Sequence, residues 1–372
     1  MSKGDGLMRR EELKDKLKTY MATIRLSGYE SRMAYQFKAD VEAYADHVKI
    51  DKLGNVIATF EGTDPEAPSL MVFAHMDVIG FVISRIEPDG FIRFERVGGI
   101  SEKIAQGNAV MVGSEDGRFY PGIIGAKAYH IQSNDEKAKV DPFSTLFIDI
   151  GAVSERQVRE LGIEVGCPIT FAPRFVELLN DRIGGTYLDD AAGLVNLLQI
   201  ASAIKAKPPK CTVHLVGTVM EEFNARGAMM AARSVKTDMA ICLLGPGAGD
   251  TPDQKSVNNV VLGGGPAVTL FNFHGKGTLN GNIAHKGLYE LLKKAAQENG
   301  IPLQRSAARG ALSDTAYLQL ENDGIPCLDM GTPDRYSHSP MESCDLKDLE
   351  QVGRLVAALI DSVDRDFPLH RY

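Results

Sequence analysis

Seven residues of the sequence have the types and positions that metal-assisted hydrolysis needs. They are histidines and carboxylates, and each stands near a point where a predicted strand, helix or turn begins or ends. Imidazole nitrogens and carboxylate oxygens are the donors that Zn²⁺ and similar divalent ions take in catalytic sites. A carboxylate shared between two metals and a free glutamate as base would complete a two-metal hydrolase. The residues are His75, Asp77, Asp189, Asp190, Glu221, Glu222 and His338.

Each of these residues also has an ordinary structural explanation. A single histidine after a strand is usually a hydrogen-bonded core residue, and a pair of acids is usually a solvated turn. The pair Asp189-Asp190 precedes a segment with helical periodicity at 191–206, where aspartate is a good N-cap. The combination therefore supports the interpretation as a metal site, and no single residue does.

The elements around these residues predict an α/β fold. Short apolar runs that end at His75 and before Glu221 are typical of strands buried on both faces of a sheet. They alternate with helical segments, a pattern that favours a mixed, largely parallel sheet flanked by helices. The carboxyl ends of such strands share one edge, where function gathers. The predicted strands are 69–74, 211–220 and 239–244, with a hairpin at 47–61; the predicted helices are two within 10–46 and those at 191–206, 225–235, 283–299 and 345–364.

The stretch from 87 to 178 departs from this alternation. It is rich in glycine and in short β-like segments, with a single helical piece near 154–161. This composition predicts a small β-rich domain of 87–178 inserted into an α/β domain made of 1–86 and 179–372.

Composition and charge exclude several functional classes. The chain has 372 residues with 41 Lys and Arg against 49 Asp and Glu, a net charge of −8 that argues against non-specific nucleic-acid binding. No apolar run approaches the roughly 20 residues of a membrane helix, and the charged first residues do not resemble a signal peptide. Five widely spaced cysteines without a CxxC pair favour buried thiols in a reducing compartment. We therefore expect a cytoplasmic protein without membrane or nucleic-acid partners.

Motifs around the candidate residues resemble the M42 family of metalloaminopeptidases, the glutamyl and deblocking aminopeptidases. They occur in the family's order along the chain, and glycine-rich stretches such as Val97-Gly-Gly-Ile100 resemble the family's PDZ-like dimerisation domain. The resemblance implies a zinc-aminopeptidase-like catalytic domain with a PDZ-like domain inserted at 87–178. The motifs are Ala-His75-Met-Asp77-Val-Ile-Gly-Phe, Leu-Asp189-Asp190-Ala-Ala-Gly, Glu221-Glu222-Phe-Asn-Ala-Arg-Gly-Ala, Ala-Gly-Asp250-Thr-Pro and Arg-Tyr-Ser-His338-Ser-Pro.

The resemblance also implies a role for each residue. His75 corresponds to a ligand of the first metal, and Asp189 to the carboxylate that bridges two metals. Glu222 and His338 correspond to the ligands that complete the second metal. The family's Asp at the position of Asp77 orients the first histidine, and the Glu at the position of Glu221 is the general base.

The sequence departs from the family next to these residues. Where the family has a further aspartate ligand, this chain has Leu244, which cannot coordinate a metal, and Ala191 replaces the usual arginine after Asp189-Asp190. The first metal then keeps two protein ligands, while the second keeps three, the usual number at a mononuclear catalytic zinc site.

We therefore expect a metalloaminopeptidase with a mononuclear or altered site that hydrolyses N-terminal residues of peptides through a metal-activated water. The implied cofactor is a divalent ion, Zn²⁺ before Co²⁺ or Mn²⁺, with one or two per chain. Peptides or amides are the expected substrates, and a dimer or dodecamer is the expected assembly. The alternative is a non-catalytic family member that keeps the fold for assembly or ligand binding.

Overall fold

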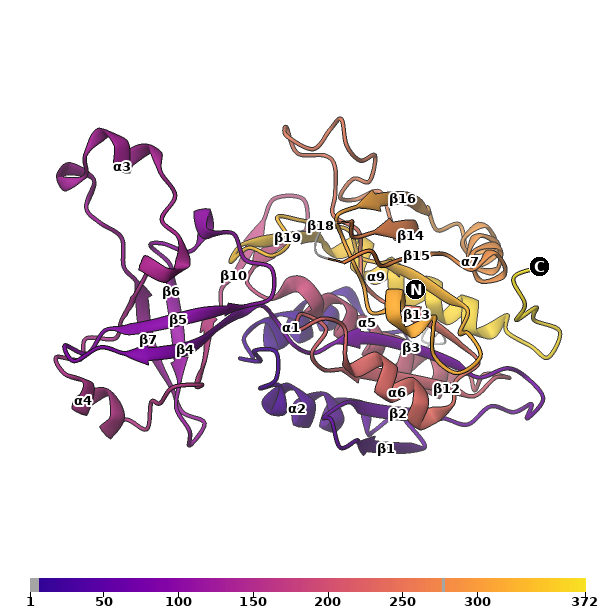
Figure 1. Ribbon diagram of the computed structural model, residues 1–372. Helices are drawn as coiled ribbons and strands as arrows, with labels where there is room; N and C mark the ends of the chain where they lie inside the picture. Colours follow the sequence, from indigo (N-terminus) through magenta and orange to yellow (C-terminus); the bar gives the residue numbers. More distant parts are fainter. Residues whose placement is uncertain (1–6, 276–277) are drawn as a thin grey trace.

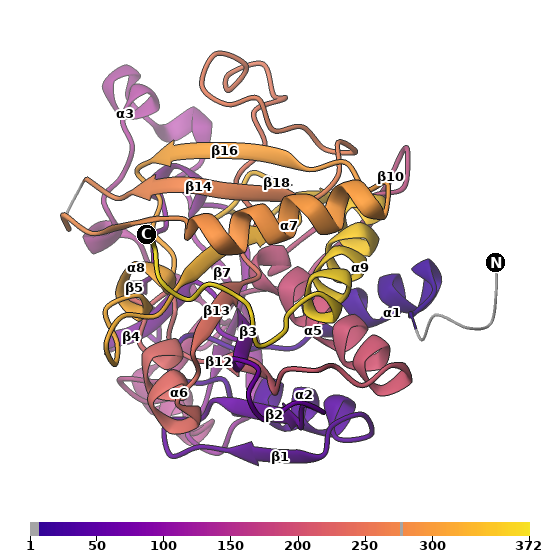
Figure 2. The same ribbon diagram turned by 90° about the vertical axis from the view of Figure 1, so that its right-hand side faces the viewer.

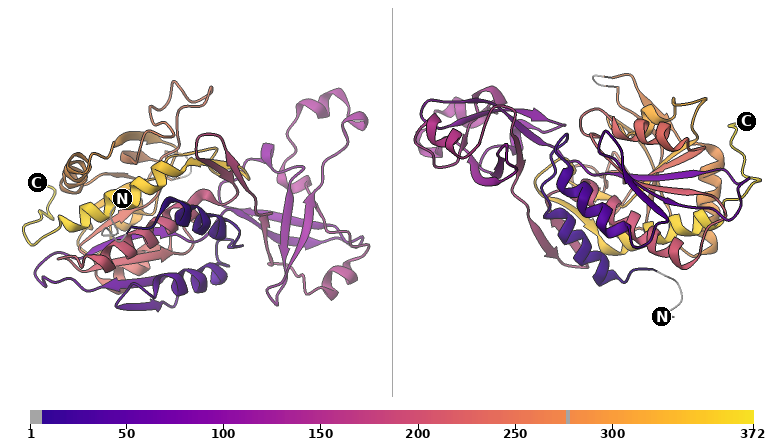
Figure 3. Two further views of the ribbon diagram at one scale, coloured as in Figure 1. Left: turned by 180° about the vertical axis from the view of Figure 1, so that it is seen from behind. Right: turned by 90° about the horizontal axis from the view of Figure 1, so that it is seen from below.

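The protein consists of an α/β body and a smaller β-barrel that stands apart from it (Figures 1 and 3). The computed structural model describes residues 7–275 and 278–372. The barrel strands run from Gly80 to Phe171, so the chain enters the barrel from the α/β body and returns to it.

The central sheet of the described residues has nine strands. Its middle four, β12, β3, β13 and β17, are parallel, and antiparallel strands flank them on both sides. This arrangement confirms the predicted mixed, largely parallel sheet. In spatial order the strands are β1 (His47–Ile50), β2 (Val56–Phe60), β12 (Val213–Thr218), β3 (Leu70–His75), β13 (Met239–Cys242), β17 (Cys327–Gly331), β14 (Ala267–Phe273) and β15 (Gly281–Ile283), with β16 (Gln304–Arg309) also paired to β14.

Helices cover both faces of this sheet. One face carries the larger layer, in which α5 packs on β3 and α9 lies between α5 and α7 (Figure 2). The other face carries two short helices over β12 and β17. The first layer is α1 (Arg10–Met21), α2 (Ser31–Val41), α5 (Leu188–Ala206), α7 (Lys286–Glu298) and α9 (Leu346–Asp361); the second is α6 (Gly227–Val235) and α8 (Thr315–Leu318).

Strand β3 is buried on both faces, as its continuous apolar sequence predicts. Leu70, Val72 and Ala74 pack into the core under the larger helix layer, while Met71 and Phe73 pack into the core under α6 and α8. Because the strand is fixed from both sides, the residues that follow it have well-defined positions.

The starts of α7 and α5 illustrate how local contacts set helix boundaries. Helix α7 begins at Lys286, because Ile283 belongs to the edge strand β15 and His285 Nδ1 accepts a hydrogen bond from the Leu288 N–H. Helix α5 is recorded from Leu188, but Asp189 and Asp190 have non-helical backbone angles, so the regular helix starts at the predicted Ala191.

The inserted region forms a closed barrel with a hydrophobic core of its own. Phe81 contacts Phe94 and Phe171 edge to face inside it. Its likeness to a PDZ domain and the domain limits of 87 and 178 stay predictions. The barrel strands are β4 (Gly80–Ile86), β5 (Ile92–Val97), β8 (Ile148–Asp149), β7 (Phe119–Ile124), β6 (Ala109–Gly113) and β9 (Pro168–Phe171), and its helices are α3 (Asn134–Ala138), α4 (Glu155–Glu160) and the 3₁₀ turns η1 (Glu102–Ile104), η2 (Tyr129–Ile131) and η3 (Phe143–Thr145).

A four-stranded sheet lies beside the barrel and brings distant segments together. Its strands are β10 (Phe175–Leu178), β11 (Arg182–Gly185), β19 (Glu342–Asp345) and β18 (Asp334–Arg335).

All five cysteines are buried and unbridged, as expected. Within the described ranges, no helix has both the length and the apolar character needed to span a bilayer.

Candidate metal centre

The predicted site residues meet at the carboxyl edge of the central sheet. Strands β3 and β12 are parallel neighbours, with His75 paired to Thr218 at their ends. A cavity of about 710 Å³ opens there. A cavity of about 810 Å³ lies between α2 and the barrel, but none of the predicted site residues lines it. The predicted residues that line the cavity at the sheet edge are His75, Asp189, Glu221, Glu222 and His338.

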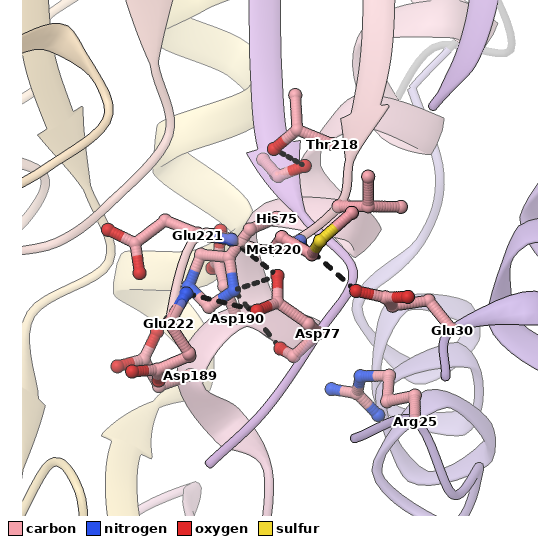
Figure 4. A network of polar contacts seen from close by, with 12 residues as sticks. Arg25, Glu30, His75, Asp77, Asp189, Asp190, Thr218, Met220, Glu221 and Glu222 are labelled. Carbon is pink, nitrogen blue, oxygen red and sulfur yellow. Dashed lines mark hydrogen bonds and ion pairs between the residues drawn. The ribbon is translucent and has the colours of Figure 1, made fainter. Parts of the chain in front are cut away.

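His75 is held in one orientation by Asp77 (Figure 4). Its Nδ1 lies 3.1 Å from the carbonyl oxygen of Asp77, which can only accept, so Nδ1 carries the hydrogen. Its Nε2 then faces Asp189, whose Oδ1 lies 2.9 Å away. This is the geometry in which a histidine nitrogen is presented to a metal with its tautomer fixed.

Asp77 also fixes the two glutamates after β12. Its Oδ1 accepts a hydrogen bond from the Glu221 N–H and its Oδ2 one from the Glu222 N–H, both at 3.0 Å. On the other side, Glu30 Oε1 accepts from the Met220 N–H at 3.1 Å. The turn that carries both glutamates is therefore held from two directions.

The two aspartates of the pair Asp189-Asp190 have different surroundings. Asp190 Oδ1 accepts the Gly193 N–H at 2.7 Å and caps α5, so the N-cap interpretation is confirmed for this residue. Asp189 instead directs its carboxylate toward His75 and accepts a hydrogen bond from Ser337 Oγ at 3.2 Å. The structural explanation therefore holds for Asp190, and the role of Asp189 as a metal ligand stays a prediction that its position at the cavity fits.

Asp189, Glu222 and His338 form a donor group suited to a metal ion. One ligand atom from each lies within 4.8 Å of the other two. His338 Nε2 is 3.8 Å from both Asp189 Oδ2 and Glu222 Oε2. Two donors on one tetrahedral Zn²⁺ are roughly 3.4 Å apart, so a small closure around an ion completes the spacing. The donor types and spacing fit a divalent cation.

A loop from the barrel covers this part of the site. The His338 Nδ1 donates to the carbonyl oxygen of Gly99 at 2.9 Å, which leaves Nε2 free for a ligand bond. A Cβ on Gly99 would lie 3.0 Å from His338 Nδ1, and one on Gly98 would lie 3.2 Å from Glu222 Oε2. The two glycines of Val97-Gly-Gly-Ile100 therefore allow the barrel to approach the donor group closely.

Glu342 is a second buried carboxylate that holds candidate ligand residues, and the sequence patterns did not reveal it. Its Oε2 accepts from the Asp189 N–H and its Oε1 from the His338 N–H, both at 3.0 Å. It is 3% exposed. Its position four residues after His338 was the only signal in the sequence, and that spacing alone does not distinguish it from a surface acid.

Glu221 lies beside the donor group without belonging to it. Burial raises the pKa of its carboxyl well above the ordinary value, and the charges of Asp314, Glu222 and Asp77 act in the same direction, against His75. A glutamate with a raised pKa in a cavity is a suitable general base.

The pKa values of the two carboxylates in the donor group shift in opposite directions. Burial opposes ionisation of Asp189, but the hydrogen bond from His75 and the charges of His75 and His338 outweigh it and lower the pKa to about 2. Burial raises the pKa of Glu222 to about 7, although His338 opposes the shift. A bound cation favours the ionised form of both groups.

Leu244 lines the cavity together with His75 and Asp189 and packs against the core under α6. Asp250, the acid six residues later, does not line that cavity. The Asp250 carboxylate accepts hydrogen bonds from Arg335 Nε at 2.7 Å, from Arg335 Nη2 at 2.6 Å and from the Leu262 N–H at 3.1 Å. Asp250 is therefore fully engaged away from the site.

The family model of the M42 glutamyl aminopeptidases matches residues 54–355, most of the chain. The chain belongs to this family. The match confirms the resemblance inferred from the motifs, and the matched range includes all three residues of the donor group.

Members of the M42 family and solved structures resemble the chain over nearly its full length. SgcX of Escherichia coli (strain K12) is 40% identical over 344 residues, which cover 92% of each chain. The aminopeptidase APDkam598 of the archaeon Desulfurococcus kamchatkensis superposes with a TM-score of 0.90 at 32% identity, covering 96% of this chain and 97% of that one. The TET1 peptidase of Pyrococcus horikoshii, which can assemble into a tetrahedron or a large octahedral shell, superposes with a TM-score of 0.84 at 28% identity, covering 94% and 100%. These relationships support a peptidase, and hence a hydrolase, function for this M42 protein.

Proposed function

We propose that this M42 protein is a metal-dependent aminopeptidase with an altered metal site. The observation that carries the proposal is the group of Asp189, Glu222 and His338 donors next to Glu221 in an accessible cavity. The alteration is Leu244, which offers no donor where the family's motif has an aspartate.

Zn²⁺ suits the donor group best, because one nitrogen and two carboxylate oxygens with room for water are typical of catalytic zinc. Co²⁺ and Mn²⁺ accept the same donors. Asp189, Glu222 and His338 would hold the ion. When bound, it polarises the scissile carbonyl and makes a nearby water more acidic.

The reaction asks two things of the protein's own side chains. Glu221 takes a proton from the attacking water and passes it to the leaving amine, so that one water is consumed for each peptide bond broken. Asp77 and Glu342 fix the backbone of the reacting and binding residues through four N–H bonds at 3.0 Å, which keeps their side chains in register during the proton transfers.

The test is a metal analysis followed by hydrolysis assays on the full chain. We expect release of the N-terminal residue from aminoacyl amides and short peptides, loss of that activity with a chelator, and recovery on adding Zn²⁺, Co²⁺ or Mn²⁺. N-acetylated peptides serve as the matched control, since an aminopeptidase requires a free amine. Bound metal without hydrolysis of any free-amine substrate would favour the alternative, a non-catalytic member that retains the fold for ligand binding or assembly.

We also propose that the chain self-associates as a dimer through the barrel region, predicted as 87–178, with a dodecamer as the larger form, and that it is cytoplasmic. The shells formed by the TET1 peptidase support such assembly. Light scattering on the intact chain should give a dimer or larger species, and a version without the barrel should be monomeric. An intact chain that is monomeric at micromolar concentration would contradict the proposal.

A further inference from the structure

The His75 side of the site lacks a donor. His75 Nε2 and Asp189 Oδ1 lie 2.9 Å apart at the cavity. Leu244 lines the same cavity with a hydrocarbon side chain. A divalent ion at His75 and Asp189 would have two protein ligands, one fewer than catalytic zinc usually has. A third donor would have to come from another residue that reaches this part of the cavity.

Asp334 is the acid that the fold places beside Leu244. Its carbonyl oxygen accepts the Ala248 N–H at 2.6 Å, and it forms a parallel bridge with Gly247, so β18 lies along the segment that follows β13. Asp334 lines the cavity together with His75, Asp189 and Leu244. It also lines a small neighbouring cavity with Asp189 and Leu244.

The side chain of Asp334 is directed by the alternation of β18. Side chains of successive strand residues point to opposite faces. Arg335 forms the ion pair with Asp250, so the neighbouring Asp334 is turned away from that arginine and toward the cavity. The same pairing removes Asp250 from consideration as the missing donor.

One oxygen of Asp334 has no partner. Its Oδ2 is buried and forms no hydrogen bond within the part of the chain that the structure describes. Of the described residues lining the large cavity, Asp334 alone has such an atom. A buried carboxylate oxygen without a partner is costly, and a cation at this position would satisfy it.

We propose that Asp334 supplies the third protein ligand for a second divalent cation, held with His75 and the shared carboxylate of Asp189, in place of a donor at Leu244. This inference rests on the proposed metal-dependent function. Within the described residues the donor atoms of Asp189, Glu222 and His338 are the ones grouped within 4.8 Å. Asp334 is outside that group, so we expect binding of the second ion to draw its carboxylate toward Asp189.

The experiment counts ions on the full chain without substrate. Zn²⁺ is titrated calorimetrically into metal-free protein, and the ions retained after dialysis are counted by elemental analysis. We expect two ions for the natural chain and one for Asp334→Asn, with affinity for the second ion at least about 100-fold weaker, beyond the loss from removing a supporting hydrogen-bond partner. Asp323→Asn removes an exposed carboxylate of the same type elsewhere and should keep both ions.

The single variant Leu244→Asp keeps the test decisive if Asp334→Asn folds poorly, and the swap of both residues completes it. Leu244→Asp in the natural chain should leave the count at two, and Leu244→Asp combined with Asp334→Asn should restore two ions. One ion in the natural chain that becomes two in Leu244→Asp would overturn the proposal, as would two ions in a folded Asp334→Asn. Because no substrate is used, absence of peptide hydrolysis would reject the proposed function and leave this count to decide the role of Asp334.

Discussion

The two histidines of the site are held in different ways. His75 is 3% exposed at the end of a strand buried on both faces, and its ring is fixed by Asp77 from the same sheet edge. The side chain of His338 is 43% exposed, and its ring is fixed by the Gly99 carbonyl in a loop of the barrel. The His75 half therefore depends on the α/β body alone, while the His338 half needs the barrel in place.

Buried carboxylates compensate for this difference. Asp77 accepts two backbone N–H groups on the His75 half, and Glu342 accepts two on the His338 half. Both are deeply buried. The backbone of the His338 half is therefore held by as many N–H bonds to a buried carboxylate as that of the His75 half, and the two halves differ in the exposure of the histidine ring. Four substitutions test this comparison, from the largest expected effect to the smallest.

Glu221→Gln tests the division of labour between adjacent glutamates. Glu221 is the proposed base, so its replacement by the amide should lower kcat by about 10²- to 10⁴-fold, the range for lost general-base catalysis, while metal content stays unchanged. Glu222→Gln is the matched comparison, because Glu222 Oε2 lies 3.8 Å from His338 Nε2 and belongs to the donor group. It should weaken metal binding instead. Equal metal loss in both variants would show that the two glutamates share one role.

Asp77→Asn tests the His75 half of the site. The asparagine keeps one acceptor oxygen but turns an NH₂ group toward one of the two N–H groups now bound at 3.0 Å. Loss of such a supporting partner typically weakens metal binding by about 10- to 100-fold, and we expect the upper part of that range because His75, Glu221 and Glu222 all move. Competition with a chelator measures the affinity. An unchanged affinity in a folded variant would mean that the sheet alone positions His75.

Glu342→Gln applies the same change to the other half. One of the N–H groups of Asp189 and His338 loses its acceptor, so the Asp189–Glu222–His338 ion should bind about tenfold more weakly. The fall is smaller than for Asp77 because the Gly99 carbonyl still fixes the His338 ring. The thermal midpoint of the metal-free protein is measured in parallel. A loss of stability without a change in metal affinity would assign Glu342 a purely structural role.

The sequence predicts the His75 half of the site better than the His338 half. His75 and Glu221 follow apolar runs whose burial on both faces can be inferred from residue type alone, and the shared edge of a parallel sheet then brings them together. Glu342 and the Gly99 carbonyl act through backbone atoms from distant parts of the chain, and no residue pattern announces such contacts. His338 is a candidate only through a polar cluster outside the predicted strands, and the family resemblance supplies its proposed role.

The barrel and the altered donor set show the same limit. Short strands and many glycines indicate a β-rich region, but closure of the barrel depends on pairings such as β4 with β9 that are far apart in sequence. Asp250 stands in a motif and Asp334 in none, yet Asp250 is occupied by its ion pair with Arg335, while Asp334 Oδ2 has no hydrogen-bond partner among the described residues. A residue's partners decide its availability, and those partners are known only after folding.

Gly99→Ala has the smallest expected effect and is the most direct test of the His338 half. The added Cβ would lie 3.0 Å from His338 Nδ1 and 3.4 Å from Cε1, so the ring must shift by a few tenths of an ångström. We expect metal affinity at the Asp189–Glu222–His338 group to fall by less than about tenfold, below the usual cost of losing a supporting partner outright. Lys103→Ala, at an exposed position of the turn η1 that follows this loop, is the control and should leave affinity unchanged. Because His75 makes no contact with this loop in the hydrogen bonds of the described residues, an ion on the His75 half should not respond to Gly99→Ala. Equal weakening on both halves would show that the barrel positions the whole site and would remove the distinction between the two histidines.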